Sequence, residues 1–247
     1  MPVLVCRLAD GLLLSVAEPG DPLTHAILED RFELNERDFI ARTVHAGHHV
    51  IDIGAHVGAH TLRLAARVVP DGTVTAIEPV PVHVARLRES VGLNDLAGTI
   101  TVLEVAAGDT PGRRELIVGG PDLASCNAWL RPDGYGEPGL RTECVDVVRV
   151  DDLALPRPQS FIKVDAEGAE GLILAGARTL LIQDRPVLLV DLHPHLLPRV
   201  SGATAQQVIH AMATLGYTCH LLGAGVAGAV IDDLPSSVVT PVVFRPA

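Results

Sequence analysis

Carboxylates and glycines occur together in two segments of the chain, and in each segment they follow a short apolar run. Residues 48–62 read HHVIDIGAHVGAHTL, and residues 161–176 read FIKVDAEGAEGLILAG. In each segment an apolar strand is predicted to end at an acid, Asp52 in the first and Asp165 in the second. Ligands of open α/β sheets bind at the carboxyl ends of strands, where neighbouring connections diverge. The two segments therefore predict one cofactor crevice and an enzyme.

The loop after the first strand favours a ligand with an amino-acid end over a dinucleotide. Gly54 permits a sharp turn after the strand, and Gly58 allows the next helix to begin close to the sheet. The backbone N–H groups of such a loop face the polar end of a ligand. A dinucleotide loop needs G-x-G-x-x-G, and here Ala55 and His56 leave no middle glycine. The pattern D-x-G-A-x-x-G suits a carboxylate and an amine better than a pyrophosphate.

A further acid, Glu78, follows the next predicted strand and suits the ribose of an adenosine. A carboxylate at that place can accept hydrogen bonds from both ribose hydroxyls. A single acid at a strand end is often only a solvated loop carboxylate, but Asp52 and Glu78 follow two strand ends in register. Both NAD and S-adenosylmethionine contain such a ribose, and the missing glycine favours S-adenosylmethionine.

The elements that must position these residues alternate between strand and helix, which predicts a mostly parallel, doubly wound α/β sheet. A hairpin turning at Asp10-Gly11 and one or two helices over 24–44 precede this core. We expect one domain over 1–247, with an N-terminal extension over 1–46 and the core over 47–247. The expected core strands are 49–53, 73–77, 100–105, 161–164 and 186–191, with closing strands at 217–222 and 238–244. The expected helices are 59–69, 81–91, 168–182 and 203–215.

The stretch 106–158 is irregular, rich in Gly and Pro, and predicts an antiparallel side hairpin from apolar runs at 115–118 and 145–150. A long loop without regular structure is usually functional or disordered. We expect 119–141 to cover the acceptor substrate, with Trp129 and Asn127 in contact with it; the alternative is a surface hairpin tip. Residues 24–40 would form the opposite wall.

Composition excludes several classes of partner. The formal net charge of −11 argues against nucleic acid and against an anionic membrane surface, because both bind clustered Lys and Arg. The four cysteines are scattered without a CxxC pair, so reduced thiols are expected. The N-terminus lacks the pattern of a signal peptide, and no apolar run reaches the length of a membrane span. We expect a soluble, cytoplasmic protein.

Four motifs in order resemble those of FkbM-type S-adenosylmethionine-dependent methyltransferases. They are VIDIGAHVGAHTL, AIEP at 76–79, FIKVDAEGAE at 161–170 and LLVDLHP at 188–194, and the third is the most specific. The resemblance covers about residues 30–195. It implies a class I methyltransferase fold, Rossmann-like, with a seven-stranded sheet, helices on both faces and an antiparallel last strand. It also implies S-adenosylmethionine as donor and a small-molecule hydroxyl, often of a sugar or natural product, as acceptor.

The resemblance also implies where the cofactor lies. The methionine end would contact Asp52, Gly54 and Gly58, and the ribose would contact Glu78. The expected cofactor residues are Asp52, Gly54, Ala55, His56, Gly58, His60, Glu78, Pro79, Ala106, Ala107 and Asp165, with the adenine beside Ala106-Ala107 and the sulfonium near Asp165. The family usually has Asn where this chain has His56, so the side-chain contacts at that turn are expected to differ.

Methyl transfer requires an aligned acceptor, a group that removes its proton and exclusion of water. Asp165, Glu167 and His193 are the catalytic candidates at the ends of the fourth and fifth core strands, with Asp191 also near. The first three also form a candidate Mg²⁺ site. Other roles are open: Glu167 as a helix cap, His193 as a turn residue and Lys163 as an ion-pair partner or a structural lysine.

Two other classes of function stay open. An NAD-dependent oxidoreductase would use the same crevice, although the missing glycine and the lack of a Tyr/Lys or Cys/His pair count against it. A non-catalytic cofactor-binding module would keep its role when Asp165 or His193 is changed. Transfer to nitrogen instead of oxygen, and assembly as a homodimer, are left open.

Overall fold

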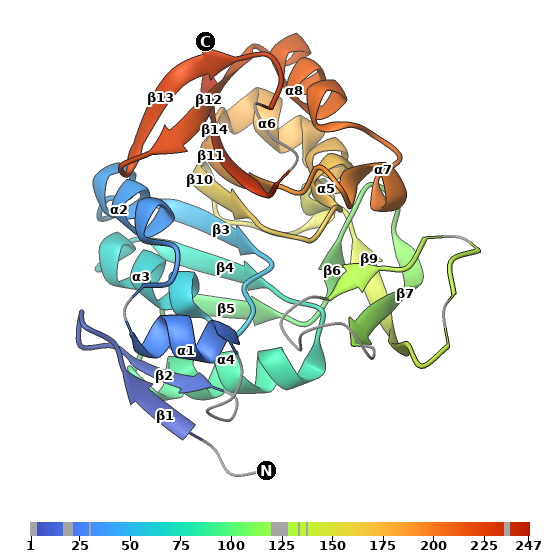
Figure 1. Ribbon diagram of the computed structural model, residues 1–247. Helices are drawn as coiled ribbons and strands as arrows, with labels where there is room; N and C mark the ends of the chain where they lie inside the picture. Colours follow the sequence, from blue (N-terminus) through green and yellow to red (C-terminus); the bar gives the residue numbers. More distant parts are fainter. Residues whose placement is uncertain are drawn as a thin grey trace.

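A mixed sheet with helices on both faces forms the centre of this computed structural model, which describes residues 4–16, 22–29, 31–119, 128–132, 134–136, 138–234 and 238–247. Figure 1 shows the arrangement. Within the described residues the main sheet has eight strands, in the order β13 (Val226–Ile231), β12 (Tyr217–Gly223), β14 (Thr240–Pro246), β11 (Val187–Leu192), β10 (Gln159–Val164), β3 (His49–Ile53), β4 (Thr73–Ile77) and β5 (Ile100–Leu103).

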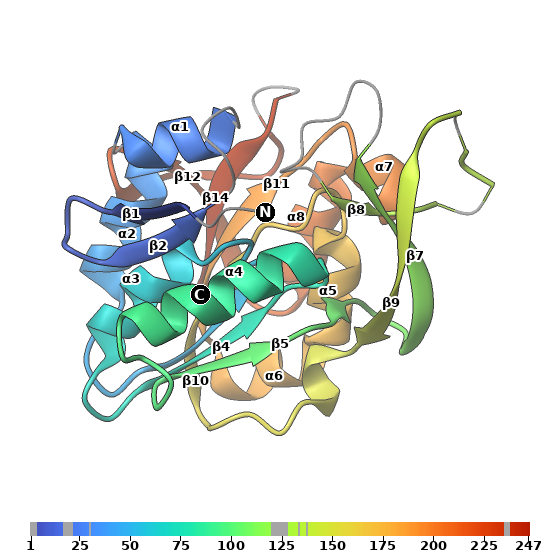
Figure 2. The same ribbon diagram turned by 90° about the horizontal axis from the view of Figure 1, so that it is seen from below.

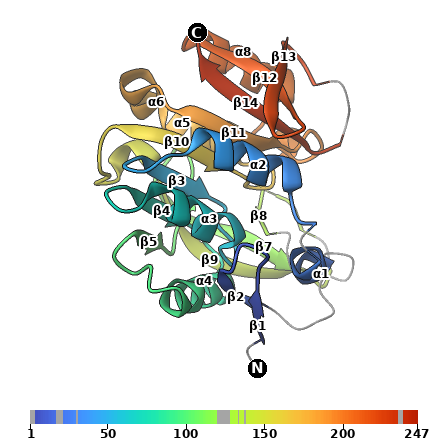
Figure 3. The same cartoon turned by 90° about the vertical axis from the view of Figure 1, so that its left-hand side faces the viewer.

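The strands β11, β10, β3, β4 and β5 run parallel to one another, as the alternating pattern predicts. The last strand, β14, lies antiparallel between β11 and β12. The predicted doubly wound class and the antiparallel last strand are confirmed. The sheet has one strand more than the seven expected, because β13 pairs with β12 at the outer edge, where Figure 3 shows the C-terminal strands. Its short Ala-, Gly- and Val-rich sequence resembles a loop more than a strand.

Each face of the main sheet packs against its own set of helices, because successive side chains of a strand point to opposite faces. Along β3, Val50 packs in the core that contains Phe39 and Leu62, whereas Ile51 packs in the core that contains Ile173. The first face carries α1 (Pro22–Leu28), α2 (Leu34–Thr43), α3 (Ala59–Val68) and α4 (Pro81–Leu93), and the second carries α5 (Glu170–Gly176), α6 (Arg178–Asp184), α7 (Leu197–Val200) and α8 (Ala205–Thr214), as Figure 2 shows for most of them.

The N-terminal hairpin and helices predicted before the core are present. The strands β1 (Leu4–Arg7) and β2 (Leu13–Val16) pair antiparallel around a turn in which Gly11 has φ 88°. Two hydrogen bonds hold the hairpin against α4. The Ser15 N–H donates to Ser90 Oγ at 2.9 Å, and the Leu13 N–H donates to Oδ1 of Asn94, the residue that follows α4, at 2.9 Å. The extension therefore packs on the core, and its second helix, α2, lies next to α3.

A second, smaller sheet follows β5. Its order in the described chain is β6 (Ala106–Ala107), β9 (Arg141–Val148), β7 (Gly112–Gly119) and β8 (Trp129–Leu130), and a short 3₁₀ helix, Val150–Asp152, follows β9. The strands β7 and β9 pair antiparallel, which confirms the predicted side hairpin. Asn127 lies outside the described residues.

The helix predicted over 168–182 is two helices, α5 and α6, which meet at Ala177. A β-carbon on Gly176 would lie 1.9 Å from the Gly108 carbonyl oxygen, so this glycine allows the end of α5 to approach the loop after β6. The sequence does not reveal this break, because the buried residues of α5 and α6 continue with the spacing of a single helix. No described helix is long and apolar enough to cross a lipid bilayer.

Candidate active site

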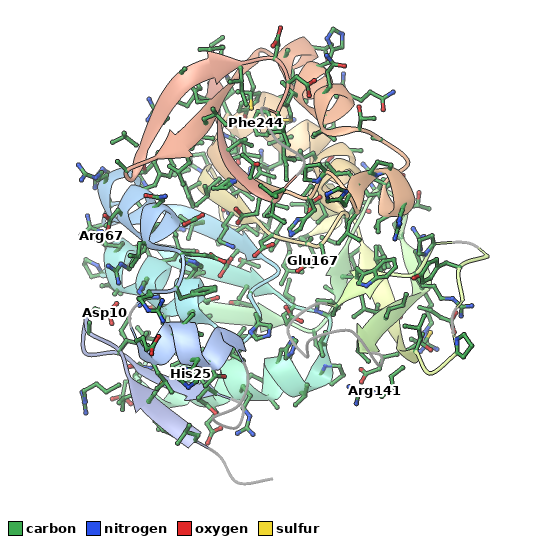
Figure 4. All side chains as sticks on the ribbon, viewed as in Figure 1. Asp10, His25, Arg67, Arg141, Glu167 and Phe244 are labelled. Atoms are coloured by element: carbon green, nitrogen blue, oxygen red, sulfur yellow. The ribbon has the colours of Figure 1, made fainter. Side chains whose placement is uncertain are left out.

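A cavity of about 240 Å³ lies where β3, β4 and β10 end and the main sheet meets the smaller sheet. Figure 4 shows Glu167 in this central region. Both acid–glycine segments line the cavity, as the sequence predicts. The lining includes most of the expected cofactor residues: Asp52, Gly54, Ala55, His56, His60, Glu78, Pro79, Ala106, Ala107 and Asp165.

The loops after β3 and β10 lie directly against each other. The Asp165 N–H donates to the Ile53 carbonyl at 3.0 Å, which continues the pairing of the two strands. Gly54 has φ 81°, and a β-carbon there would lie 1.7 Å from the Asp165 carbonyl oxygen. Any side chain at this position would therefore force the two loops apart, so Gly54 is required for the contact between them.

Gly58 is the one expected cofactor residue that does not line the cavity. Its φ is 98°, and a β-carbon there would lie 2.5 Å from Leu87 Cδ1 of α4. Gly58 precedes α3, as predicted, and the absence of a side chain allows α3 to begin against α4. Its expected contact with the cofactor stays a prediction.

Glu78 ends β4 as a buried, ionised carboxylate. Its Oε2 accepts from the His56 N–H at 2.9 Å, and its Oε1 accepts from the Val80 N–H at 3.0 Å and lies 3.2 Å from His83 Nδ1. Burial favours the neutral acid, but the bond and charge of His83 and the other contacts outweigh it and lower the pKa of Glu78. His83 was not predicted as a site residue, and only its position in the first turn after Glu78-Pro79 pointed to it.

Lys163 is the centre of a buried charge cluster. It pairs in register with Asp52 across β10 and β3, and its side chain is on the same face of the sheet. The residue is 2% exposed, and its Nζ lies 3.4 Å from Asp165 Oδ2, 3.6 Å from Asp191 Oδ2 and 3.9 Å from Glu33 Oε2. Burial opposes the ammonium, but Asp165, Glu33 and Asp191 outweigh it and raise the pKa of Lys163 well above its ordinary value. Lys163 is therefore both an ion-pair partner of acids and a buried structural lysine, the two roles that the sequence left open.

Glu33 is a site residue that sequence reasoning missed. It precedes α2 in a left-handed conformation with φ 42°, and its Oε2 lies 2.6 Å from His60 Nε2. Burial opposes its charge, but Lys163 and His60 outweigh burial and lower the pKa of Glu33 to about 2. The interpretation of 24–40 as a cavity wall included this position, but nothing in the local pattern distinguished Glu33 from Glu29 or Glu36.

His193 lies behind the cavity lining and contacts three carboxylates. Its Nδ1 is 3.0 Å from Glu170 Oε1, and its Nε2 is 3.4 Å from Glu167 Oε2 and 3.8 Å from Asp165 Oδ1. Burial opposes the imidazolium, but the bond to Glu170 and the three charges raise the pKa of His193 to about 9. At neutral pH the ring is therefore protonated, and it would have to lose its proton before it could accept another proton or bind a metal. This disfavours the expectation of His193 as base or metal ligand.

Glu167 combines exposure to the cavity with an unusual conformation and acidity. It lines the cavity with a side chain that is 20% exposed, and its φ of 48° is uncommon for a residue with a side chain. Burial raises the pKa of Glu167 to about 7, with Asp165 and Glu170 adding to the rise and His193 opposing it. A carboxyl group with this pKa exchanges protons readily near neutral pH.

Glu170, and not Glu167, accepts hydrogen bonds from backbone N–H groups of the loop before α5. Glu170 Oε1 accepts from the Gly168 N–H at 2.9 Å and from the Ala166 N–H at 3.3 Å, in addition to its contact with His193. These hydrogen bonds fix the conformation of the loop between β10 and α5. The expectation that Glu170 is structural agrees with this geometry, and Glu167 is left to face the cavity.

The predicted Mg²⁺ set of Asp165, Glu167 and His193 is not supported. Among the residues that the structure describes, the carboxylates whose oxygens lie within 4.8 Å of one another are Glu33, Asp165 and Asp191. The ammonium of Lys163 lies within 4.0 Å of each of the three and supplies their cation. Metal binding by His193 would also require the loss of its proton, which its raised pKa opposes.

An apolar wall closes the side of the cavity near the smaller sheet. Leu116 and Leu130 pair across β7 and β8, and Trp129 and Ile173 lie beside them in the lining. Trp129 is buried, and its ring centroid lies 5.1 Å from that of Tyr135. A Trp at a surface hairpin tip would be more exposed, so the geometry favours the wall over that alternative.

Comparison with known proteins gives a family match and a fold. A family model described as the methyltransferase FkbM domain matches residues 52–219. The methyltransferase FkbM structure from Methylobacillus flagellatus KT is similar with a TM-score of 0.52 and 19% identity, over 81% of this chain and 44% of that chain. The structure of M. jannaschii TYW2 in complex with AdoMet is similar with a TM-score of 0.50 and 13% identity, over 99% of this chain and 87% of that one.

A curated protein matches a short part of the chain. Carboxy-S-adenosyl-L-methionine synthase of Chromohalobacter salexigens is 46% identical over 52 residues, which are 21% of this chain and 19% of that protein. The chain thus spans less than half of the M. flagellatus protein and aligns with about a fifth of the curated one. The structural likenesses identify the fold as that of class I methyltransferases.

Proposed function

The chain belongs to the family of the methyltransferase FkbM domain, and from this premise we propose that it transfers a methyl group from S-adenosylmethionine to a hydroxyl of a small molecule. One observation carries the proposal: a single cavity is lined by an ionised carboxylate at the end of β4 and by a carboxyl with a pKa of about 7 after β10. The first suits an adenosine ribose, and the second suits removal of a proton from an acceptor.

The lining residues fit the chemical groups of the cofactor. Glu78 would accept the ribose hydroxyls, and the small side chains of Ala106 and Ala107 leave room for the adenine. Asp52 has a buried oxygen, Oδ1, for which the described residues provide no hydrogen-bond partner, and a cationic ligand would satisfy it. When bound, the cofactor supplies an electrophilic methyl group on a positively charged sulfur, which the acid Asp165 would favour electrostatically.

Glu167 is the group that would accept the acceptor's proton. The Glu167 carboxylate would accept the proton of the acceptor's hydroxyl, and the cofactor would supply the methyl group that this hydroxyl oxygen takes. His193, held by Glu170, stabilises the ionised form of Glu167 through its charge at 3.4 Å. Asp165 is engaged by Lys163 and His193, which leaves Glu167 as the better base.

The wall around Trp129 supports an acceptor with an apolar or aromatic surface beside its hydroxyl. Nucleic acid and membrane surfaces are not part of the proposal, because the chain carries a formal net charge of −11 and phosphates require clustered Lys and Arg. An NAD-dependent reaction is the alternative, but Glu33, Asp52 and Asp165 in the lining would repel a pyrophosphate.

Calorimetric titration with S-adenosylhomocysteine and with NAD, each with and without Mg²⁺, tests the cofactor class. We expect micromolar binding of S-adenosylhomocysteine that Mg²⁺ does not change. Binding of NAD alone would overturn the proposal, and a requirement for Mg²⁺ would restore the metal hypothesis. Mass spectrometry of a panel of phenols, sugars and amines incubated with S-adenosylmethionine would then show whether oxygen or nitrogen receives the methyl group.

A further inference from the structure

Glu33 lies outside the residues that the family model matches, 52–219, yet it lines the same cavity as the motif residues. It belongs to the N-terminal extension, just before α2, and has φ 42°. A residue with a side chain adopts this left-handed conformation at a cost and keeps it where the surrounding structure holds it in place. Two neighbours do so here, His60 and Lys163.

Among the described residues, the contacts of Glu33 occupy only one of its two carboxylate oxygens. Its Oε2 lies 2.6 Å from His60 Nε2 and 3.9 Å from Lys163 Nζ. The neighbouring Phe32 ring packs against the His60 ring with centroids 5.6 Å apart. These contacts fix the position of the carboxylate at the edge of the cavity and leave Oε1 for a ligand.

A second observation at the same end of the cavity points to a cationic ligand. Asp52 is 1% exposed, lines the cavity, and has an oxygen, Oδ1, without a hydrogen-bond partner among the residues described. Its other oxygen, Oδ2, accepts from Thr61 Oγ1 at 2.5 Å. Burial raises the pKa of Asp52, as expected for a carboxyl that lacks a sufficient cation.

Carboxyl groups outnumber cations at this end of the cavity. Glu33, Asp165 and Asp191 surround the ammonium of Lys163, and Asp52 is its direct neighbour in the sheet. Burial outweighs the attraction of Lys163 for Asp52 and Asp191 and raises the pKa of both, which favours the neutral acids. A ligand that brings a further ammonium into this end would favour the ionised form of Asp52 and supply a partner for it.

We propose that Glu33, together with Asp52, binds the α-ammonium of the amino-acid end of the S-adenosyl cofactor. The N-terminal extension is then part of the cofactor site and closes its methionine end. The inference rests on the proposed function, because it requires a ligand that carries an amino-acid end. The adenosine end of the same ligand, held near Glu78, does not depend on Glu33.

Two ligands that differ only in the amino-acid end test this division. S-adenosylhomocysteine carries the ammonium, and 5′-methylthioadenosine retains the thioether and adenosine without it. We would measure the Kd of both by calorimetry for the wild-type chain, for Glu33→Gln and for Asp38→Asn, an exposed acid of α2. We expect Glu33→Gln to raise the Kd of S-adenosylhomocysteine about 10- to 100-fold and to leave that of 5′-methylthioadenosine within about twofold. The control should change neither.

The outcomes separate the inference from the function it rests on. An equal loss for both ligands would mean that Glu33 only supports the fold, and no loss for either would mean that it does not bind the ligand; both results overturn the inference and leave the proposed function standing. A wild-type chain that binds neither ligand would remove the proposed function and the inference with it. If Glu33→Gln does not fold, Glu33→Asp keeps the charge on a shorter side chain. Its loss of affinity should still be at least about fivefold greater for S-adenosylhomocysteine than for 5′-methylthioadenosine.

Discussion

The two acid–glycine segments look alike in the sequence but differ in the structure. The loop after β3 holds its residues through close backbone contacts, and the carboxylate that it contacts, Glu78, has a lowered pKa and three donors. The loop after β10 places Glu167 against His193, which follows β11, and their pKa values are about 7 and about 9. Under the proposed function these values suit the first loop to binding a ligand without exchange of protons and the second to exchanging them.

Changing the proton acceptor should have the largest effect and should affect turnover without affecting binding. Glu167→Gln retains the shape of the side chain but cannot accept a proton at neutral pH. We expect kcat to fall about 10²- to 10⁴-fold, as for loss of a general base, while the Kd of S-adenosylhomocysteine stays within about threefold. Methylation assays and calorimetry on the same preparation would check both values. An active Glu167→Gln would assign the base elsewhere.

Changing the tight contact between the two loops should have a large effect on stability. Gly54→Ala places a β-carbon 1.7 Å from the Asp165 carbonyl oxygen at a φ of 81°. The clash and the left-handed backbone together should lower the free energy of unfolding by about 2–4 kcal/mol. Urea denaturation would measure it. Gly92→Ala is the matched control, because nothing lies within 4 Å of its added β-carbon, and it should leave stability unchanged or raise it.

The imidazolium of His193, which follows β11, should make stability depend on pH. The pKa of His193 is raised in the folded protein from 6.5 to about 9, so the folded state holds the proton more tightly than the unfolded state does. The stabilisation is complete below pH 6.5 and is lost as the pH rises through about 9, a change on the order of 3 kcal/mol. Urea titrations at pH 6 and pH 10 would measure the change, and His193→Gln should reduce it. A wild-type curve that stays level over this range would mean that the ring is neutral in the folded protein.

Changing the ribose acid should have the smallest of these effects on the site, and it should also lower stability, because the His56 and Val80 N–H groups lose their acceptor. Glu78→Ala removes charged hydrogen bonds and should weaken cofactor binding by about 1–3 kcal/mol. Calorimetry with S-adenosylhomocysteine and with 5′-methylthioadenosine should show similar losses for both, because both carry the ribose. Glu104→Ala, an exposed acid paired with Arg88, is the control and should change neither affinity. Unchanged binding in Glu78→Ala would remove Glu78 from the site.

The sequence predicted the positions of most elements because each depends on local patterns. Apolar runs ending at Asp52 and Asp165 mark strands, and the glycines after them mark turns, whatever the rest of the chain does. It did not predict β13, whose few small residues form a strand only because β12 offers a free edge. It also missed the break between α5 and α6, which depends on the approach of Gly176 to Gly108.

Only the tertiary structure decided the roles of the charged side chains. The sequence determined that acids and glycines lie at the carboxyl ends of strands and hence that a crevice forms there. It did not determine that Glu33 reaches Lys163, or that Glu170 holds His193 in its protonated form. A pKa depends on burial and on charges a few ångströms away, and those charges come from residues far apart in the chain. For this reason the proposal of Glu167 as the base, with the cation of His193 beside it, depends on the tertiary structure.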